Sequence, residues 1–399
     1  MGGGSSRPWT ELSGETNWKD MLDPLDEDLR MYLIHYGERV QAIYDAYNGQ
    51  EESGDGYGMP LYPMDKLFSE VGLETDNNKF RYEVTRYFYV PSHATFLVQP
   101  DRSWAGYVAV STDEGTQALG RRDILVTWRG TANLLESIED IRDDLAPATN
   151  IFKDDTDTKI HAGFLDLYTK SDLLNEYTRR SARDQVLREV RKQVDLYAGK
   201  GETISITVAG HSLGAALATI NALDIVTNGY NAPTDHPENA CLVTAFPFAS
   251  PKVGDENFQA KFLSSEKLRA LRVTNALDIV PFTPPIRYYH VGEQLLVDSR
   301  KSPDLKPLYS GLTGAMAIGH MLETCLHLIA GTQGIDSDEF NVGERRGIAL
   351  VNKGMDALKD ERKIPAYWLV AKNKNMVQDE VTGDWSLAPP YIPPPPEDN

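Results

Sequence analysis

Residues 204–218 read Ile204-Ser205-Ile206-Thr207-Val208-Ala209-Gly210-His211-Ser212-Leu213-Gly214-Ala215-Ala216-Leu217-Ala218. The β-branched residues that come first predict a strand, and the small residues that come last predict a helix lying close to a sheet. A G-x-S-x-G motif joins the two, with Ser212 at its centre. A strand, a sharp turn and a helix around this motif are typical of an α/β hydrolase, in which the serine hydroxyl stands exposed as a nucleophile.

The residue types of the motif have a steric and an electrostatic reason. A turn this tight leaves no room for side chains beside the serine, so glycine is needed at positions 210 and 214. The amino terminus of the following helix directs its partial positive charge to the place where negative charge develops during acyl transfer. We therefore predict Ser212 as the catalytic nucleophile.

Strands and helices alternate on both sides of this stretch. Such alternation implies right-handed crossovers and a largely parallel sheet. We expect an α/β fold with a central, mostly parallel sheet flanked by helices. The expected strands are 82–91, 104–111, 124–128, 204–208, 241–248 and 268–273, and the expected helices are two stretches within 17–47, then 181–198, 215–226, 256–263, 319–330 and 343–358.

Length and charge limit the classes of function. The chain has 399 residues, of which 59 are acidic and 40 basic, so its formal net charge is −19. We expect a flexible stretch at 1–16, a single hydrolase domain at 17–388 with a helical N-terminal extension, and a Pro-rich tail at 389–399. The negative charge disfavours nucleic acid as a partner and fits a neutral or zwitterionic substrate better. We find no apolar run of membrane-spanning length.

A serine nucleophile needs a base, and the base needs a carboxylate that orients it. In α/β hydrolases the acid and then the histidine follow the serine along the chain. Four histidines come after Ser212. We favour His320, because it follows a glycine at the expected start of a helix, where a side chain can lean into a cleft. The other three are His236, His290 and His327, and the last of these lies seven residues beyond His320, where packing in the core is the ordinary role.

The orienting acid should follow a strand that comes after the nucleophile. Asp278 lies just beyond such a strand, and Pro281 stops regular structure there. Asp298 is the alternative, but it is more typical of a turn at the end of a hairpin. We therefore prefer Asp278.

The oxyanion of the tetrahedral intermediate needs two donors. We predict the backbone N–H of Leu213, next to the nucleophile, and Thr131, which follows the strand at 124–128. We expect Arg129 to tie loops together rather than touch substrate. The amphipathic stretch 132–145 predicts a surface helix, with a movable lid as an alternative.

We expect no cofactor. The sequence shows no dense cluster of His and Cys at ligand spacing, so no metal is predicted. The two cysteines, Cys241 and Cys325, lie in apolar runs, and buried free thiols of this kind suit a reducing compartment.

Several motifs together resemble the lipase class 3 family, and more closely the plant class II phospholipases A1. The resemblance covers most of the chain and rests on Trp128-Arg129-Gly130-Thr131, Ile160-His161-Ala162-Gly163-Phe164, Gly210-His211-Ser212-Leu213-Gly214, Leu277-Asp278-Ile279-Val280-Pro281 and His320-Met321-Leu322-Glu323.

This resemblance implies a serine acylhydrolase that removes the sn-1 acyl chain from phosphatidylcholine and related lipids at an interface, with peripheral membrane contact. It gives Ser212, Asp278 and His320 the roles of nucleophile, acid and base. It also implies a cytoplasmic member, because the plastid-targeted class carries a long transit segment that we do not find here. The alternatives are a galactolipid, triacylglycerol or small-ester hydrolase with the same triad, and a non-catalytic lipid-binding protein on a lipase fold.

Overall fold

The computed structural model describes residues 7–91, 102–130, 144–307 and 318–396. Within these ranges a seven-stranded sheet forms the centre of the molecule, in the order β1-β2-β3-β6-β7-β8-β9. Strands β3, β6, β7, β8 and β9 pair in parallel, and β1 and β2 extend the sheet by antiparallel pairing. The predicted mostly parallel α/β fold is therefore confirmed. The strands are β1 (Tyr82–Pro91), β2 (Arg102–Ser111), β3 (Arg122–Trp128), β6 (Ile204–His211), β7 (Leu242–Phe248), β8 (Leu268–Asn275) and β9 (Glu293–Val297).

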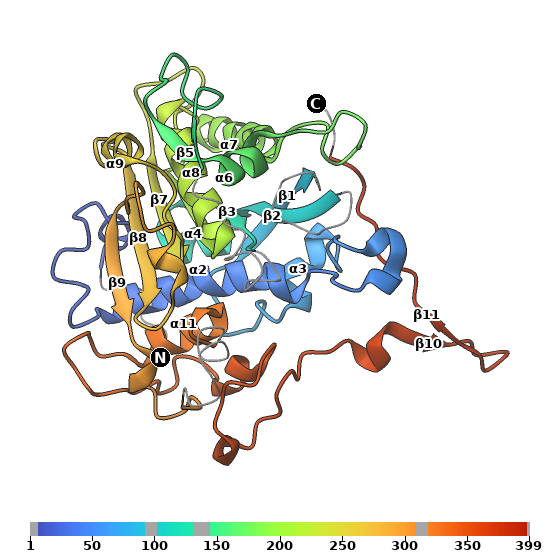
Figure 1. Ribbon diagram of the computed structural model, residues 1–399. Coiled ribbons are helices and arrows are strands. Elements are labelled where there is room, and N and C mark those ends of the chain that lie inside the picture. The colour runs from blue at the N-terminus through green and yellow to red at the C-terminus, as the bar shows by residue number, and fades with distance from the viewer. Residues whose placement is uncertain (1–6, 92–101, 131–143, 308–317, 397–399) are drawn as a thin grey trace.

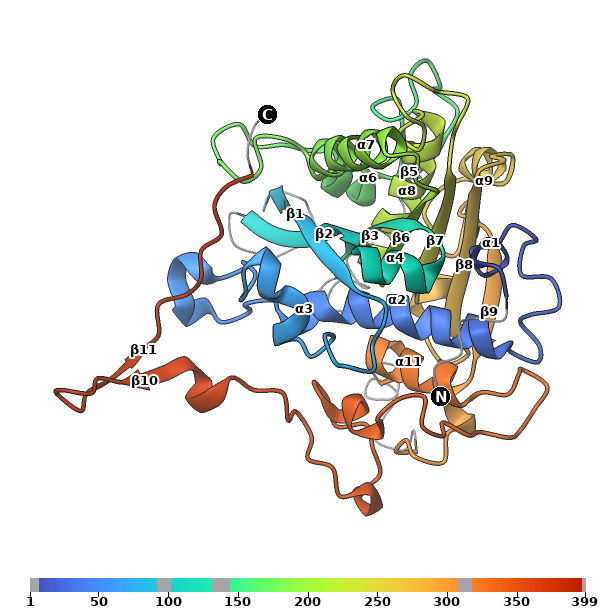
Figure 2. The same ribbon diagram turned by 180° about the vertical axis from the view of Figure 1, so that it is seen from behind.

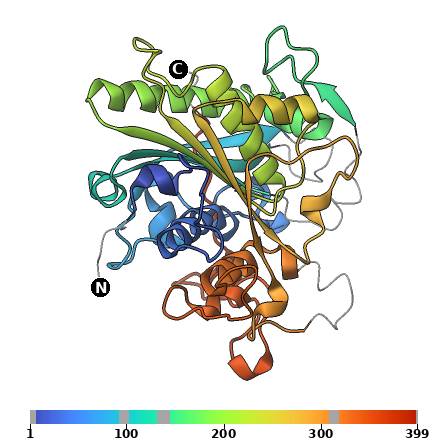
Figure 3. The ribbon, with the colours of Figure 1, turned by 90° about the vertical axis from the view of Figure 1, so that its left-hand side faces the viewer.

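Helices cover both faces of this sheet, as Figures 1 and 2 show from opposite sides. Helices α6 (Ala162–Thr169), α7 (Ala182–Gly199) and α8 (Leu213–Thr227) lie on one face, and α2 (Glu27–Asp45) and α11 (Leu322–Gly331) lie on the other. Figure 3 shows the sheet between these two layers. Each layer encloses its own apolar cluster. Both faces of β6 are buried: Ile204, Ile206 and Val208 belong to one apolar cluster, and the hydroxyls of Ser205 and Thr207, which alternate with them, donate hydrogen bonds to Asp123.

The close approach of α2 and α11 depends on a glycine. A Cβ at Gly37, in the middle of α2, would lie 2.2 Å from Cδ2 of Leu326 in α11. No side chain larger than hydrogen fits between the two helices at this point. Helix α2 is thereby packed directly on α11, which begins just after His320.

The helix predictions need three corrections. Residues 17–26 form turns, and the single helix α2 begins only after Asp26, whose carboxylate caps the amides of Asp28 and Leu29. Residues 318–320 are helical but Met321 has extended backbone angles, so the helix predicted over 319–330 is interrupted at 321 and α11 begins at 322. The helix predicted at 343–358 is wrong: this stretch contains the short 3-10 helix η6 (Ile348–Asn352), and glycines at 343, 347 and 354 explain why a longer helix does not form.

The helix predicted at 256–263 is confirmed as α9, and the other elements of the described ranges are short or were not predicted. Strand β9 and helices α4 (Asp113–Leu119) and α6 were missed, because their apolar residues are few or lack a clear period. The remaining elements are α1 (Trp9–Leu12), α3 (Leu67–Glu70), β4 (Leu145–Pro147), β5 (Lys159–His161), α9 (Glu256–Leu263), β10 (Met376–Gln378), β11 (Trp385–Leu387) and the 3-10 helices η1 (Glu51–Gly56), η2 (Met64–Lys66), η3 (Val280–Phe282), η4 (Ser299–Lys301), η7 (Asp360–Arg362) and η8 (Lys372–Asn375).

The C-terminal segment leaves the body and returns to it. The β10–β11 hairpin lies on an outlying arm, and the chain then runs back toward the segment between α6 and α7 (Figure 1). There the hydroxyl of Tyr177 donates a hydrogen bond of 2.7 Å to the carbonyl of Pro393. The described part of the Pro-rich tail is therefore extended and contacts the main body at Tyr177 and, through Pro390, at Gly56.

Candidate active site

Ser212 stands on a strained turn between β6 and α8. Its backbone angles are φ 58° and ψ −128°, a conformation that costs a residue with a side chain about 1–3 kcal/mol. A Cβ at Gly210 would lie 2.3 Å from the carbonyl oxygen of Gly214, and a Cβ at Gly214 would lie 2.3 Å from that of Trp128. The steric reason predicted for both glycines is confirmed, and the turn holds Ser212 at the carboxyl end of β6.

Asp278 and His320 meet at the same edge of the sheet. Asp278 follows β8, and its Oδ2 lies 2.7 Å from Nδ1 of His320. Its Oδ1 accepts the backbone N–H of Val280 at 3.0 Å. Both side chains are buried, with 2% of Asp278 and 1% of His320 exposed. The structure thus brings together the two residues that the sequence suggested as acid and base.

The hydrogen bond to Asp278 determines which tautomer of His320 is present. A carboxylate only accepts, so Nδ1 of His320 carries the proton and donates it. Nε2 of His320 is buried and has no hydrogen-bond partner among the described residues. A neutral imidazole in this state presents an unshared electron pair at Nε2, which is what a general base requires.

The backbone of His320 is linked to the residue that precedes Ser212. Nε2 of His211 donates to the carbonyl oxygen of His320 at 2.7 Å, and the centroids of the two rings lie 4.8 Å apart. Burial lowers the pKa of His211 to about 3, so its ring is neutral near pH 7. This contact brings the Asp278–His320 pair to the turn that carries Ser212.

The rival residues have other partners. Nε2 of His327 forms a 2.8 Å hydrogen bond with the hydroxyl of Ser302 and lies 3.7 Å from Asp304. His236 is exposed and lies 3.2 Å from Glu238. Asp298 accepts three hydrogen bonds from the guanidinium of Arg300. Neither His327 nor Asp298 joins the group around Ser212.

The end of β3 forms the other side of the site. A Cβ at Gly130 would lie 3.1 Å from the Cβ of Ser212, so the chain after β3 passes directly beside the serine. Arg129 was expected to tie loops together. Its guanidinium instead donates to two residues of strand β2, the carbonyl of Trp104 at 3.0 Å and the hydroxyl of Ser103 at 2.8 Å, and so links the end of β3 to β2.

Only part of the predicted oxyanion site can be placed. Leu213 is the first residue of α8, and first-turn amides have no acceptor within their own helix. Thr131 and residues 132–143 of the predicted lid lie outside the described residues. The end of the lid stretch is described: Leu145 begins strand β4, which pairs with β5, so residue 145 is not helical as the sequence suggested.

The sequence alone did not single out Tyr44 or the side chain of His211. The hydroxyl of Tyr44, at the end of α2, lies 2.9 Å from Nδ1 of His211 and 3.0 Å from the backbone nitrogen of Gly130. Tyr44 is one of several tyrosines on α2, and their helical spacing indicated only a buried face. Its partners lie 86 and 167 residues away, and such pairs leave no local sequence signal.

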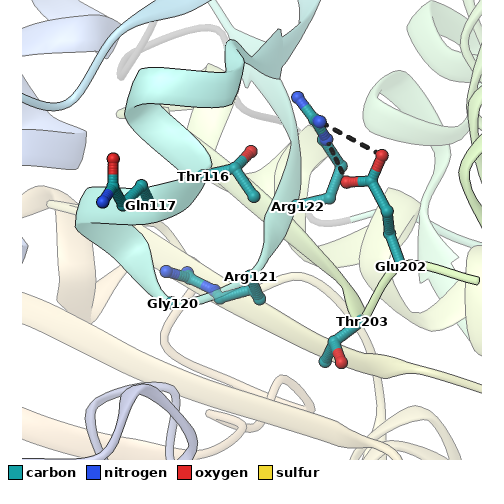
Figure 4. Close-up of a pocket in the computed structure, with 7 residues that line it drawn as sticks. All are labelled: Thr116, Gln117, Gly120, Arg121, Arg122, Glu202 and Thr203. Carbon is teal, nitrogen blue, oxygen red and sulfur yellow. Dashed lines mark hydrogen bonds and ion pairs between the residues drawn. The ribbon is translucent and has the colours of Figure 1, made fainter.

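A surface hollow lies elsewhere on the molecule (Figure 4). It sits where β3 begins and just before β6 begins, at the amino ends of strands whose carboxyl ends carry the site. The guanidinium of Arg122 in this hollow is bound by Glu202 at 2.7 and 3.1 Å and by Asp113 at 2.6 Å. Its charge is compensated by the protein itself, so the hollow gives no sign of a ligand site.

Two features are absent from the described part of the chain. It contains no group of three or more His, Cys, Asp or Glu residues arranged to hold a metal ion. Over the same residues, no helix combines the length and apolar character needed to span a bilayer.

An α/β fold with a serine on a sharp turn and a buried histidine–aspartate pair nearby is typical of serine hydrolases. In line with this, residues 125–288 match the family model of lipase (class 3). The chain belongs, more narrowly, to the phospholipase A1-II family of plants. It is 46% identical to phospholipase A1-IIgamma of Arabidopsis thaliana over 396 residues, which cover 96% of this chain and 92% of that protein.

The chain is also similar to a rice relative and to a solved structure. Phospholipase A1-II 7 of Oryza sativa subsp. indica is 43% identical over 409 residues, covering 97% of each chain. The nonglycosylated LIP2 lipase of Yarrowia lipolytica aligns with a TM-score of 0.46 and 18% identity, over 69% of this chain and 82% of that one.

Proposed function

We propose that the protein is a serine acylhydrolase that cleaves the sn-1 acyl ester of phospholipids such as phosphatidylcholine through an acyl-enzyme on Ser212. The observation that carries the chemistry is the 2.7 Å hydrogen bond from Nδ1 of His320 to Asp278, which leaves Nε2 of the same ring unpaired. The choice of phospholipid as substrate is supported by relatives that are named phospholipases A1.

In the first half-reaction, Oγ of Ser212 attacks the ester carbonyl carbon while Nε2 of His320 takes the hydroxyl proton. The carboxylate of Asp278 stabilises the imidazolium that forms. The carbonyl oxygen becomes an oxyanion, to which the amide of Leu213 and, in our proposal, Thr131 donate hydrogen bonds. Each such donor contributes roughly a hundredfold to a thousandfold to the rate.

The intermediate then collapses and the ester C–O bond breaks. The leaving lysolipid oxygen takes the proton from Nε2 of His320, and the acyl group remains on Ser212. In the second half-reaction water gives its proton to His320 and attacks the acyl carbon. The proton returns to Oγ of Ser212 as the fatty acid leaves, so the enzyme is regenerated without a cofactor.

The test is hydrolysis of phosphatidylcholine with distinguishable sn-1 and sn-2 chains. We expect release of the sn-1 fatty acid, and no release above background by Ser212→Ala at an unchanged melting temperature. Release of the sn-2 chain would overturn the regiochemistry, and faster hydrolysis of galactolipid or triolein would overturn the substrate. A folded parent protein that a fluorophosphonate does not label would favour the lipid-binding alternative.

We also propose that the loop after Asp278 meets the lipid surface. Ile279, Phe282 and Ile286 expose 42%, 59% and 65% of their surface. The stretch 279–292 contains no acidic residue, although the whole chain carries a net charge of −19. Exposed apolar side chains on a segment free of carboxylates can enter the interfacial region of a membrane without bringing in negative charge.

Vesicle binding tests this surface. We expect the double variant Phe282→Ser/Ile286→Ser to bind phosphatidylcholine vesicles several-fold more weakly and to hydrolyse a dissolved short-chain ester at the parent rate. Leu263→Ser is the matched control, because Leu263 is 61% exposed at the end of α9. Equal loss of vesicle binding in the control and the double variant would contradict the proposal.

The cytoplasm is the proposed compartment. Cys241 and Cys325 are free thiols, and burial raises the pKa of Cys241 to about 12, which keeps this thiol protonated and unreactive. Free thiols suit a reducing compartment. Cell fractionation tests the proposal, and recovery of the protein in the secreted fraction would refute it.

A further inference from the structure

We infer that Tyr44 and His211 are positioning residues that fix the backbone of His320 and the chain after β3 with respect to Ser212. This inference rests on the proposed function, because it assigns a task within the same site. It adds two residues, one of which lies on the N-terminal helix, far from the serine in sequence. Neither residue needs to touch the substrate for this role.

A continuous line of hydrogen bonds connects the two sides of the site. The backbone N–H of Gly130 lies 3.0 Å from the hydroxyl of Tyr44, and that hydroxyl lies 2.9 Å from Nδ1 of His211. Nε2 of His211 lies 2.7 Å from the carbonyl oxygen of His320. Ser212 follows His211 directly in the chain. The hydrogen bonds therefore pass beside the serine, from Gly130 after β3 to the backbone of His320.

The direction of every bond in this line is determined. A carbonyl oxygen only accepts, so Nε2 of His211 must carry a proton. The ring is neutral near pH 7, because burial lowers the pKa of His211 to about 3. Nδ1 therefore carries no proton and accepts one from the hydroxyl of Tyr44. The Tyr44 oxygen in turn accepts the N–H of Gly130, and burial raises the pKa of this phenol to about 12, which keeps its proton in place.

The surrounding packing keeps these groups in place. A Cβ at Gly130 would lie 2.5 Å from the hydroxyl oxygen of Tyr44 and 2.6 Å from the carbonyl oxygen of His211, so the three segments touch. Tyr44 is carried by α2, which packs at Gly37 against α11, the helix that follows His320. Helix α2 therefore contacts the site in two ways: directly through the side chain of Tyr44, and indirectly through α11, the helix that follows His320.

Tyr44→Phe removes one hydroxyl and leaves the ring in place. Nδ1 of His211 then loses its donor, the amide of Gly130 loses its acceptor, and the His211 ring is free to turn away from His320. We expect kcat to fall roughly 10-fold to 100-fold, because small misplacements of catalytic groups are costly. KM should change less than about threefold, because in this role Tyr44 acts through His211 and Gly130 and does not touch the substrate.

The control is Tyr107→Phe. The hydroxyl of Tyr107 is buried and donates to the carbonyl of Arg39 at 2.8 Å, on the same helix α2. This variant makes the same chemical change at a buried site without a link to Ser212. We expect a lower melting temperature with kcat within about twofold of the parent.

Variants at His211 give an independent readout. His211→Gln keeps an N–H that can donate to the carbonyl of His320, whereas His211→Leu has no donor. We expect His211→Gln to retain at least about ten times the kcat of His211→Leu at equal melting temperature. Equal kcat in these two folded proteins would overturn the inference even if Tyr44→Phe did not fold.

The rate of fluorophosphonate labelling separates this inference from the proposed function. If the parent is not labelled, the proposed function fails. If the parent is labelled and Tyr44→Phe reacts as fast as Tyr107→Phe, the proposed function stands and the positioning role is wrong. Slower labelling of Tyr44→Phe alone supports the positioning role, because the probe reports on the reactivity of Ser212 without a lipid.

Discussion

Asp278→Asn changes one atom of the buried pair and tests the assignment of the acid. Oδ1 of Asp278 accepts the N–H of Val280 at 3.0 Å, and Oδ2 accepts Nδ1–H of His320 at 2.7 Å. An asparagine that keeps the bond to Val280 directs its NH2 group at Nδ1 of His320. The imidazole must then accept at Nδ1 and carry its proton at Nε2, where it cannot take a proton from Ser212.

The size of the effect follows from the two possible orientations. If the amide turns around, its oxygen faces Nδ1 of His320 and the useful tautomer returns, but its NH2 group then faces the backbone N–H of Val280. A buried donor left without an acceptor costs about 1–3 kcal/mol. The imidazolium also loses a carboxylate, and unit charges about 4 Å apart interact by about 4 kcal/mol at an effective dielectric constant near 20. Together these losses of about 5–7 kcal/mol predict a fall in kcat of about five-thousandfold to a hundred-thousandfold.

The assay is hydrolysis of a dissolved p-nitrophenyl ester together with thermal unfolding. We expect nearly unchanged KM and a melting temperature close to that of the parent, because Asn has the shape of Asp. A kcat within about tenfold of the parent would show that Asp278 does not orient the base. The same fall in Asp298→Asn would show that the acid was chosen wrongly.

Three further predictions use the same protein. His320→Ala should lower kcat at least about a thousandfold, whereas His327→Ala should lower the melting temperature and leave kcat near that of the parent; the reverse ranking in ester hydrolysis would refute the choice of base. Gly130→Ala should reduce both kcat and the melting temperature, because its Cβ would lie 2.5 Å from the hydroxyl oxygen of Tyr44; parent-like values for both would contradict the tight contact. Burial lowers the pKa of His211 to about 3 and of His327 to about 4, below the value of about 6.5 in an unfolded chain. Between these pKa values and about 6.5 the unfolded state therefore binds more protons than the folded state. The free energy of unfolding is then highest above about pH 6.5 and falls on acidification toward pH 4. The fall is up to about 1.4 kcal/mol per pH unit for each histidine. Urea unfolding at about pH 7.5 and 5.5 measures this, and equal stability at both would contradict it.

Much of the fold was predictable because the relevant signals are local. The run into Gly210 and the small residues after Gly214 specify a strand, a turn and a helix within 15 residues. Asp278 and His320 were placed by their positions at the ends of predicted elements. Packing then brings the two together across 42 residues of chain.

The errors have physical causes as well. Periodicity between 343 and 358 predicted a helix, but the glycines in that stretch favour irregular backbone. Met321 adopts extended angles, which interrupt the predicted helix between residues 318–320 and α11, and the apolar spacing in the sequence does not report this break. Tyr44 was not identified, because its hydrogen bonds depend on how α2 lies across the sheet. No spacing in the sequence encodes that contact.

The packing of α2 and α11 on one face of the sheet limits how far the protein can be truncated. The segment that matches the lipase class 3 family, residues 125–288, contains Ser212 and Asp278 but ends before His320 and begins after Tyr44. A fragment expressed from those boundaries would bear a serine without its base and a sheet stripped of one of its two layers. Truncation mapping of activity should therefore find both borders of the minimal enzyme well outside the recognisable family segment.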